Sequence, residues 1–207
     1  MSTQAGTHDH VIHFDPYGKK LGMWLFLFTE VLLFGGLFIV YATYRFIYPE
    51  AFHVGSAQLD VVIGAINTAI LLTSSLTVAL SITALQKGET RKALNFIWAT
   101  IIFALVFLVN KYFEWLSKYE HGLFPGMDHY KELPNGEAQF FNLYFFMTGL
   151  HAIHVIVGAI LLLIIAIYIK KGSINKNRYI YLENGGLYWH LVDVIWIYLF
   201  PLFYLII

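Results

Sequence analysis

Cysteine is absent from this chain of 207 residues, and charged side chains make up only 13% of it. Without cysteine there is no disulfide, no cysteine-ligated zinc site and no iron–sulfur cluster. The 13 basic and 13 acidic residues balance, so no excess of positive charge indicates a nucleic-acid partner. Apolar residues are abundant instead: they form 58% of the sequence and fall in long runs. This composition is typical of a helical protein that crosses a membrane several times.

The first 18 residues are polar and contain His8, His10 and His13. They lack the charged segment, short apolar core and small-residue cleavage site of a signal peptide. Alternating histidines can bind a metal, but we favour the interpretation of a solvated tail. We therefore expect a polar N-terminal tail over residues 1–18 and a membrane domain over residues 19–207.

Five apolar segments are long enough to cross a bilayer as helices, since a span needs about 20 apolar residues. They cover residues 20–47, 59–86, 92–117, 139–169 and 186–207. Pro49 predicts the end of the first helix, and Pro201 predicts a bend or an end in the last one. The sequence therefore predicts an all-α, polytopic membrane protein with five transmembrane helices.

Basic residues are divided unevenly between the two ends of these helices. Nine of them precede the first span or lie in the second and fourth connections, namely Lys19, Lys20, Lys87, Arg91, Lys92, Lys170, Lys171, Lys176 and Arg178. The other side has four, namely Arg45, Lys111, Lys118 and Lys131. Because cytoplasmic loops carry the excess of Lys and Arg, we expect the N-terminus in the cytoplasm and the C-terminus on the periplasmic side.

Several polar residues fall inside the expected spans, where such side chains are costly and need a partner. They are Glu30, Asn67, Glu114, His151, His154, His190 and Asp193. At a rise of about 1.5 Å per residue, Glu30 and Asp193 lie about 15 Å from the cytoplasmic end and His154 about 22 Å from it. We therefore expect Glu30, Asp193 and His154 to converge. A hydrogen-bond network that fixes packing, a proton relay and polar anchoring of a lipid are all open as roles for this group.

The histidines do not favour a redox centre in this chain. His154 and His190 differ by roughly 12 Å in depth, which is too far for the two axial ligands of one haem. His151 and His154 belong to one helix. Small residues are expected where helices approach closely; among them are Gly35, Gly36, Gly158 and Gly186. Candidates for contacts with lipid headgroups are Arg45, Lys170 and Lys171.

Many of these residues also lie in motifs of a known family, the cytochrome c oxidase subunit III family of the haem–copper oxidases. The motifs that carry the resemblance are Thr29-Glu30-Val31 through Gly36-Leu37-Phe38, Asn67-Thr68 with the Ser/Thr-rich helix, Gly88 to Lys92, Glu114-Trp115, Thr148-Gly149 with His151, His154 and Gly158, and Tyr188-Trp189-His190 with Asp193 and Trp196. The resemblance covers nearly the whole chain after Lys19. Seven-helix members begin two helices earlier, so this sequence is similar to the five-helix bacterial form.

This resemblance implies a non-catalytic accessory subunit that carries no cofactor or metal of its own. It implies direct contact with subunit I, association with subunit II and a small subunit IV, and haem and copper in subunits I and II. Such a complex reduces dioxygen to water and pumps protons in the aerobic electron transport chain of a bacterial plasma membrane; membership of a larger respiratory supercomplex is open. Subunit III of this family is expected to stabilise subunit I, to bind phospholipid and to support proton uptake.

Cytochrome c is the electron donor that we expect for the complex. Subunit III of a bo-type quinol oxidase or of a nitric oxide reductase complex is the alternative, because electron donors dock on other subunits. A stand-alone proton-coupled transporter or a b-type cytochrome is an alternative of another class. A Soret band from the chain purified alone would indicate the b-type cytochrome.

Overall fold

The computed structural model describes residues 16–127, 130 and 132–206 of the chain. The helices in this part are α1 (Pro16–Ile47), α2 (Pro49–Ala57), α3 (Val61–Gln86), α4 (Thr90–Glu120), α6 (Asn135–Lys170) and α7 (Ile180–Tyr204). All of them except α2 are long and apolar enough to cross a membrane. The predicted all-α fold with five spans is therefore confirmed, whereas α2 was not predicted. The predicted tail lies outside the described residues up to residue 15, and α1 begins at Pro16.

Some helices extend beyond the apolar segments that predicted them, because polar residues continue the helix. The last helix begins at Ile180 rather than at 186. The Glu183 carboxylate in its first turn is paired with Lys20 at 3.0 Å, and an acidic side chain at this position interacts favourably with the helix dipole. Pro201 does not end this helix, which continues for one turn to Tyr204. At the start of α3, the side chain of Asp60 caps the helix by accepting hydrogen bonds from the backbone N–H groups of Val62 (2.8 Å) and Ile63 (3.2 Å).

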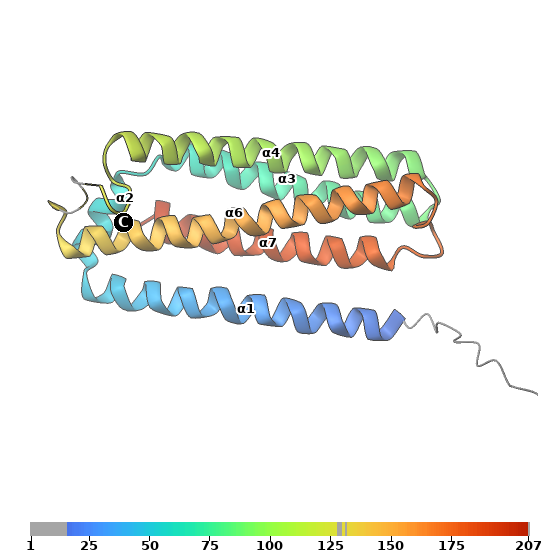
Figure 1. Ribbon diagram of the computed structural model, residues 1–207, viewed down its shortest axis with the longest axis horizontal. Helices are drawn as coiled ribbons and strands as arrows, with labels where there is room; N and C mark the ends of the chain where they lie inside the picture. The colour runs from blue at the N-terminus through green and yellow to red at the C-terminus, as the bar shows by residue number, and fades with distance from the viewer. Residues whose placement is uncertain (1–15, 128–129, 131, 207) are drawn as a thin grey trace, which may run out of the picture.

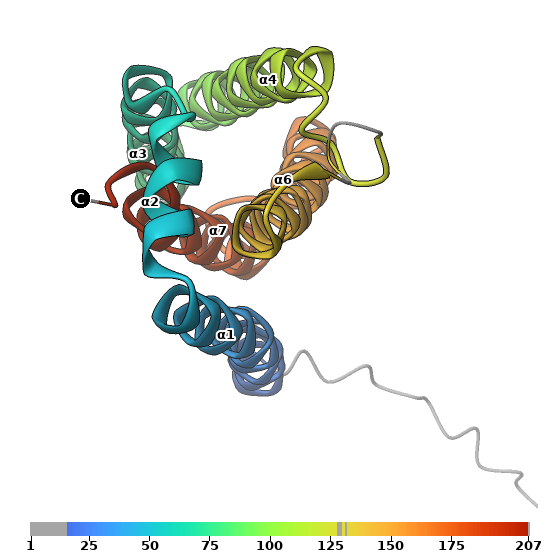
Figure 2. The same ribbon diagram turned by 90° about the vertical axis from the view of Figure 1, so that its left-hand side faces the viewer.

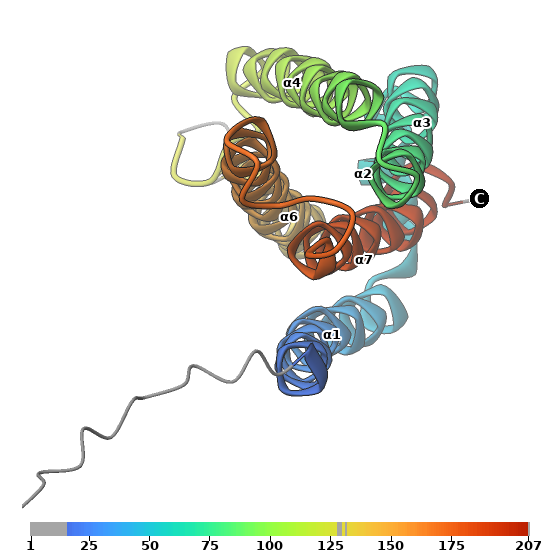
Figure 3. The same ribbon diagram turned by 90° about the vertical axis from the view of Figure 1, so that its right-hand side faces the viewer.

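Four of the long helices, α3, α4, α6 and α7, form a bundle, and α1 lies against it on the side of α6 and α7 (Figures 1, 2 and 3). The short helix α2 lies across one end of the bundle (Figure 2). We call this end the α2 end; α1 begins at the opposite end. The 18-residue apolar window of α1 is only 11% buried, against 50% for that of α7. Most of the α1 surface is therefore left for lipid or for another protein.

Close packing between α6, α7 and α3 depends on glycine. A Cβ added at Gly158 of α6 would lie 2.8 Å from the ring of Trp189, and one at Gly186 would lie 2.8 Å from Ile82. By contrast, a Cβ at Gly35 or Gly36 would meet nothing within 4 Å. The prediction of close helix approach is confirmed for the first two glycines and is wrong, within the described chain, for the last two, because the helix face that carries them has no neighbour.

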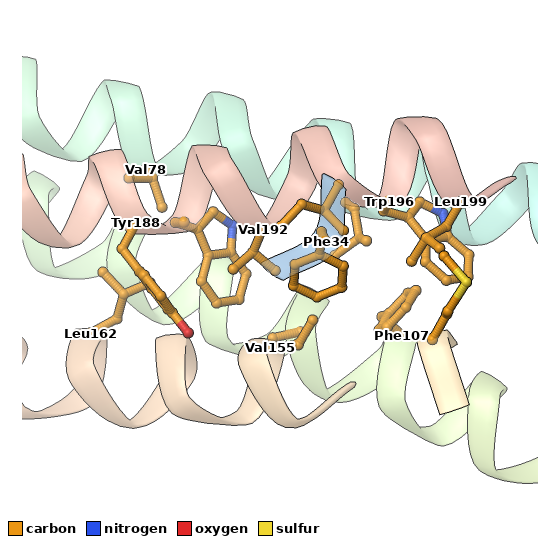
Figure 4. Close-up of a cluster of buried hydrophobic side chains, with 14 of the residues drawn as sticks. Phe34, Val78, Phe107, Val155, Leu162, Tyr188, Val192, Trp196 and Leu199 are labelled. Atoms are coloured by element: carbon orange, nitrogen blue, oxygen red, sulfur yellow. The ribbon is translucent and has the colours of Figure 1, made fainter. Parts of the chain in front are cut away.

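A line of buried apolar residues joins α1 to the bundle. Leu27, Phe34 and Tyr41, spaced by seven residues, are buried, and Figure 4 shows Phe34 in one cluster with Val155 of α6 and Val192 of α7. The Tyr41 hydroxyl donates a hydrogen bond to the carbonyl of Leu202 in α7. One stripe of α1 therefore fixes the helix and brings Glu30, one turn before Phe34, against α6.

Candidate functional site

Glu30 of α1 and His154 of α6 form a polar pair. Glu30 Oε2 lies 2.9 Å from His154 Nε2, and the two side chains are only 15% and 13% exposed. His154 Nδ1 lies 2.7 Å from the carbonyl oxygen of Leu150, and the ring of Phe34 packs edge-on against the imidazole. The contact between Glu30 and His154 that depth predicted is therefore present.

The geometry of this pair defines where its protons lie. A carbonyl oxygen only accepts hydrogen bonds, so His154 Nδ1 must carry a hydrogen. A hydrogen on Nε2 as well would make the ring an imidazolium facing a Glu30 carboxylate; a neutral ring must instead accept one from a protonated Glu30. In both states one hydrogen bond joins the two side chains.

Asp193 does not join this pair, which corrects the predicted convergence. It is only 3% exposed and neighbours Ser75 of α3, yet neither carboxyl oxygen has a hydrogen-bond partner among the described residues. His190, one turn earlier, has its Nδ1 2.5 Å from the Ser75 hydroxyl. The physical reason is rotation: equal depth does not decide which side of α7 a residue occupies, and this side is turned to α3.

His151 and Asn67 are both fully buried in the bundle. The His151 ring lies between the rings of Phe107 and Trp196, with centroids 5.6 and 5.1 Å away, and neither of its nitrogens has a partner in the described chain. Asn67 Oδ1 accepts a hydrogen bond of 2.9 Å from Asn110 Nδ2. These two residues therefore contribute to the core and not to the Glu30–His154 pair.

Glu114 belongs to a buried cluster that the sequence did not predict. Lys111 Nζ donates to Glu114 Oε2 at 3.1 Å, to the hydroxyl of Tyr144 at 3.0 Å and to that of Tyr204 at 2.9 Å. Both tyrosine hydroxyls donate to Glu114 Oε1. Lys111, counted above among the basic residues of the outer side, is 2% exposed, so it belongs to this buried cluster and not to the surface of that side. Its i,i+3 spacing from Glu114 was the available signal.

A cleft of about 610 Å³ lies between α1, α6 and α7 at the end where α1 begins. Its walls are mostly apolar, with Phe26, Ile164 and Tyr188 among them. Its polar rim includes Asn184 and Tyr181, which bind the backbone carbonyl and the ammonium of Lys19 at 3.3 and 2.8 Å.

The Tyr188 hydroxyl donates to the carbonyl of His154 at 3.3 Å, so the cleft adjoins the Glu30–His154 pair. Of the predicted headgroup residues, Lys170 and Lys171 are exposed at the end of α6 beside this cleft. Arg45 lies at the other end of α1, where it lines a second pocket of about 510 Å³.

No group of three or more His, Cys, Asp or Glu side chains in the described part of the chain is arranged to hold a metal ion. His8, His10 and His13 lie outside the described residues.

Comparison with known proteins gives one consistent family. The family model described as "Cytochrome c oxidase subunit III" matches residues 1–206. The chain is 32% identical to the cytochrome c oxidase subunit 3 of Thermostichus vulcanus, over 96% of this chain and 92% of that protein. It is 26% identical to the cytochrome bo(3) ubiquinol oxidase subunit 3 of Buchnera aphidicola, over 99% of this chain and 93% of the relative. It is also 30% identical to a heme-copper oxidase subunit I+III of Aeropyrum pernix, over 92% of this chain but 23% of that longer protein.

Proposed function

The chain belongs to the cytochrome c oxidase subunit III family and is an accessory subunit of a haem–copper oxidase, and from this premise we propose how it serves the complex. It assembles with subunit I, together with subunit II and a small subunit IV, in a bacterial plasma membrane. The relative that contains subunits I and III in one polypeptide supports the contact with subunit I. Haem and copper belong to the partner subunits, and cytochrome c is the electron donor; a quinol donor is the alternative, supported by the bo(3) relative.

The cleft between α1, α6 and α7 is the single observation that carries the specific role, which is to hold a phospholipid. Its volume of about 610 Å³ falls in the range of ligand sites, and its apolar walls suit acyl chains. Its polar rim, with Lys19, Tyr181 and Asn184, suits a headgroup. Lys170 and Lys171 add positive charge beside it, and cationic residues at a membrane surface attract anionic lipids.

The excess of basic residues places the end of the bundle with this cleft in the cytoplasm, as the positive-inside rule requires. The N-terminus is then cytoplasmic and the C-terminus periplasmic. Because Lys111 is buried, the periplasmic side in this orientation carries even fewer surface charges. The lipid headgroup would lie in the cytoplasmic leaflet, on the side from which an oxidase takes up protons.

Glu30 and His154 support proton uptake in this proposal. The hydrogen-bonded pair lies at a depth of about 15 to 22 Å from the cytoplasmic end, next to the lipid cleft. In this proposal the pair assists the chemistry of subunit I and performs none of its own.

Lipid retention in the purified complex tests the cleft. We expect Ile164→Trp, which places an indole in the cleft wall, to remove about one phospholipid per complex, measured by mass spectrometry of extracted lipid. Ile167→Trp is the matched control, since Ile167 is 46% exposed against 43% for Ile164 and does not line the cleft. Equal lipid content in the two variants would contradict the lipid site. Failure of subunit I to co-purify with the wild-type chain in mild detergent would overturn the assembly itself.

A further inference from the structure

One face of α7 points neither to α6 nor into the bundle. It carries His190, Val194, Ile197 and Pro201, which follow one another at helical spacings of three or four residues. Val194 and Ile197 are 45% and 41% exposed, and Pro201 is exposed as well. Because α7 packs on α3 along one side and on α1 along another, this face lies between those two helices (Figures 2 and 3).

His190 makes this face different from a surface that only meets lipid. It lies seven residues after Glu183, about 10 Å along the helix axis and therefore inside a hydrocarbon layer about 30 Å thick. Its contact with Ser75 at 2.5 Å uses Nδ1, and this is its side chain's only hydrogen bond to a described residue. The side chain is half-buried, so Nε2 can be reached from the open side of α7.

An imidazole nitrogen without a partner at this depth is costly, since lipid chains offer no hydrogen bond and an unsatisfied polar group in hydrocarbon costs several kcal/mol. Asp193 is a second polar side chain close to this face. It lies one turn further along α7, buried, with both carboxyl oxygens unpartnered in the described chain. A Ser75 hydroxyl that donates to His190 can still accept from a protonated Asp193. The polar atom of this region that has no partner in the described chain and lies on the open side of α7 is therefore His190 Nε2.

We propose that a transmembrane helix of subunit I packs along this face of α7 and brings a polar side chain to His190 Nε2. The inference rests on the proposed assembly with subunit I and states which face of this chain subunit I contacts. A hydroxyl or amide fits best, because each can donate or accept and so matches either tautomer of the His190 ring. Subunit I is the occupant to expect, because the relative from Aeropyrum pernix has both subunits in one chain.

Both ends of the face have features that limit how such a helix can lie. At the end where α1 begins, Lys20 of α1 and Glu183 of α7 form an ion pair of 3.0 Å. At the other end, α2 connects α1 to the start of α3 (Figure 2). The accessible length of α7 between them contains His190, Val194 and Ile197, which places the polar contact in the central part of the interface.

Site-specific photo-cross-linking in the assembled complex tests this proposal. A benzophenone amino acid is incorporated at Val194 or Ile197, and at Ile156 of α6 as a control of similar exposure, 45%. We expect cross-links to subunit I from both α7 positions, well above the yield at Ile156. If subunit I co-purifies but the α7 positions cross-link only to lipid or to another subunit, the proposed interface is wrong. If subunit I does not co-purify at all, the proposed assembly fails instead.

Substitution of His190 gives an independent measurement. Hydrogen bonds between membrane helices contribute about 0.6–2 kcal/mol, so His190→Leu should speed dissociation of this subunit from the complex about 3- to 30-fold. His190→Gln keeps a donor and an acceptor and should dissociate at close to the wild-type rate, whereas equal rates for the Leu and Gln variants would contradict the polar contact. A cross-link at Val194 in the Leu variant would show that α7 is still folded there and still packed on subunit I.

Discussion

Replacement of Lys111 by methionine should destabilise the protein more than any change of a surface charge. The substitution keeps most of the side-chain volume but removes the ammonium that donates to Glu114 and to the hydroxyls of Tyr144 and Tyr204. Both members of the ion pair are 3% exposed. At 3.1 Å and an effective dielectric constant of about 20, their Coulomb attraction is about 5 kcal/mol, and a buried charge without its partner typically costs 3–5 kcal/mol.

Thermal dissociation of the purified complex measures this loss. For a chain of this size, 1 kcal/mol corresponds to about 2–4 °C in melting temperature, so Lys111→Met should lower it by about 6–20 °C. The loss of intact complex after heating can be followed by size-exclusion chromatography. Lys171→Met is the control, since Lys171 is exposed at the end of α6, and it should stay within about 0.5 kcal/mol of the wild type.

A second substitution separates the charge effect from a packing effect. In the double variant Lys111→Met, Glu114→Gln no unpaired charge remains, and the amide oxygen still accepts from the two tyrosine hydroxyls. Replacing both partners of a buried pair by neutral groups is often close to neutral. We therefore expect the double variant to recover at least half of the lost stability. A double variant as unstable as the single one, or a single variant that melts within about 2 °C of the wild type, would refute this reasoning.

Three further predictions concern packing, capping and the polar pair. Gly158→Ala should destabilise by about 1–3 kcal/mol, because its methyl would overlap a buried indole ring, whereas Gly35→Ala should not destabilise; thermal dissociation compares the two. Asp60→Ala should cost about 1 kcal/mol through loss of the helix cap, and Asp60→Asn should restore most of it in the same assay. Glu30→Gln should leave the complex assembled with electron transfer largely intact, because the amide can still hydrogen-bond to His154, whereas His154→Ala should reduce co-purification with subunit I more strongly; equal recovery would contradict this ranking.

Sequence reasoning was successful where position along a helix axis decides the answer. Hydrophobic length defines the spans, and the constant rise per residue places Glu30 and His154 at compatible depths, where the structure has them in contact. It failed where rotation about the axis decides. Asp193 has the right depth but faces α3, because Gly186 on this side of α7 packs directly on Ile82. Close contacts of this kind decide which sides of two helices meet. A single sequence shows that a glycine is present but does not show which residue of another helix packs against it.

Lys111 shows a second limit, and it bears on how the polar residues should be interpreted. A lysine some ten residues from the end of a long helix resembles an interfacial anchor, and only the arrival of Tyr144 and Tyr204 from two other helices makes burial possible. That cluster is satisfied within the chain, so it stabilises the fold and requires no partner. His190 also lies at membrane depth, but only its Nδ1 has a partner among the described residues, the hydroxyl of Ser75. Since His190 lies on an exposed face of α7 and its Nε2 has no partner in the described chain, a neighbour in the assembled oxidase is the group that can supply one.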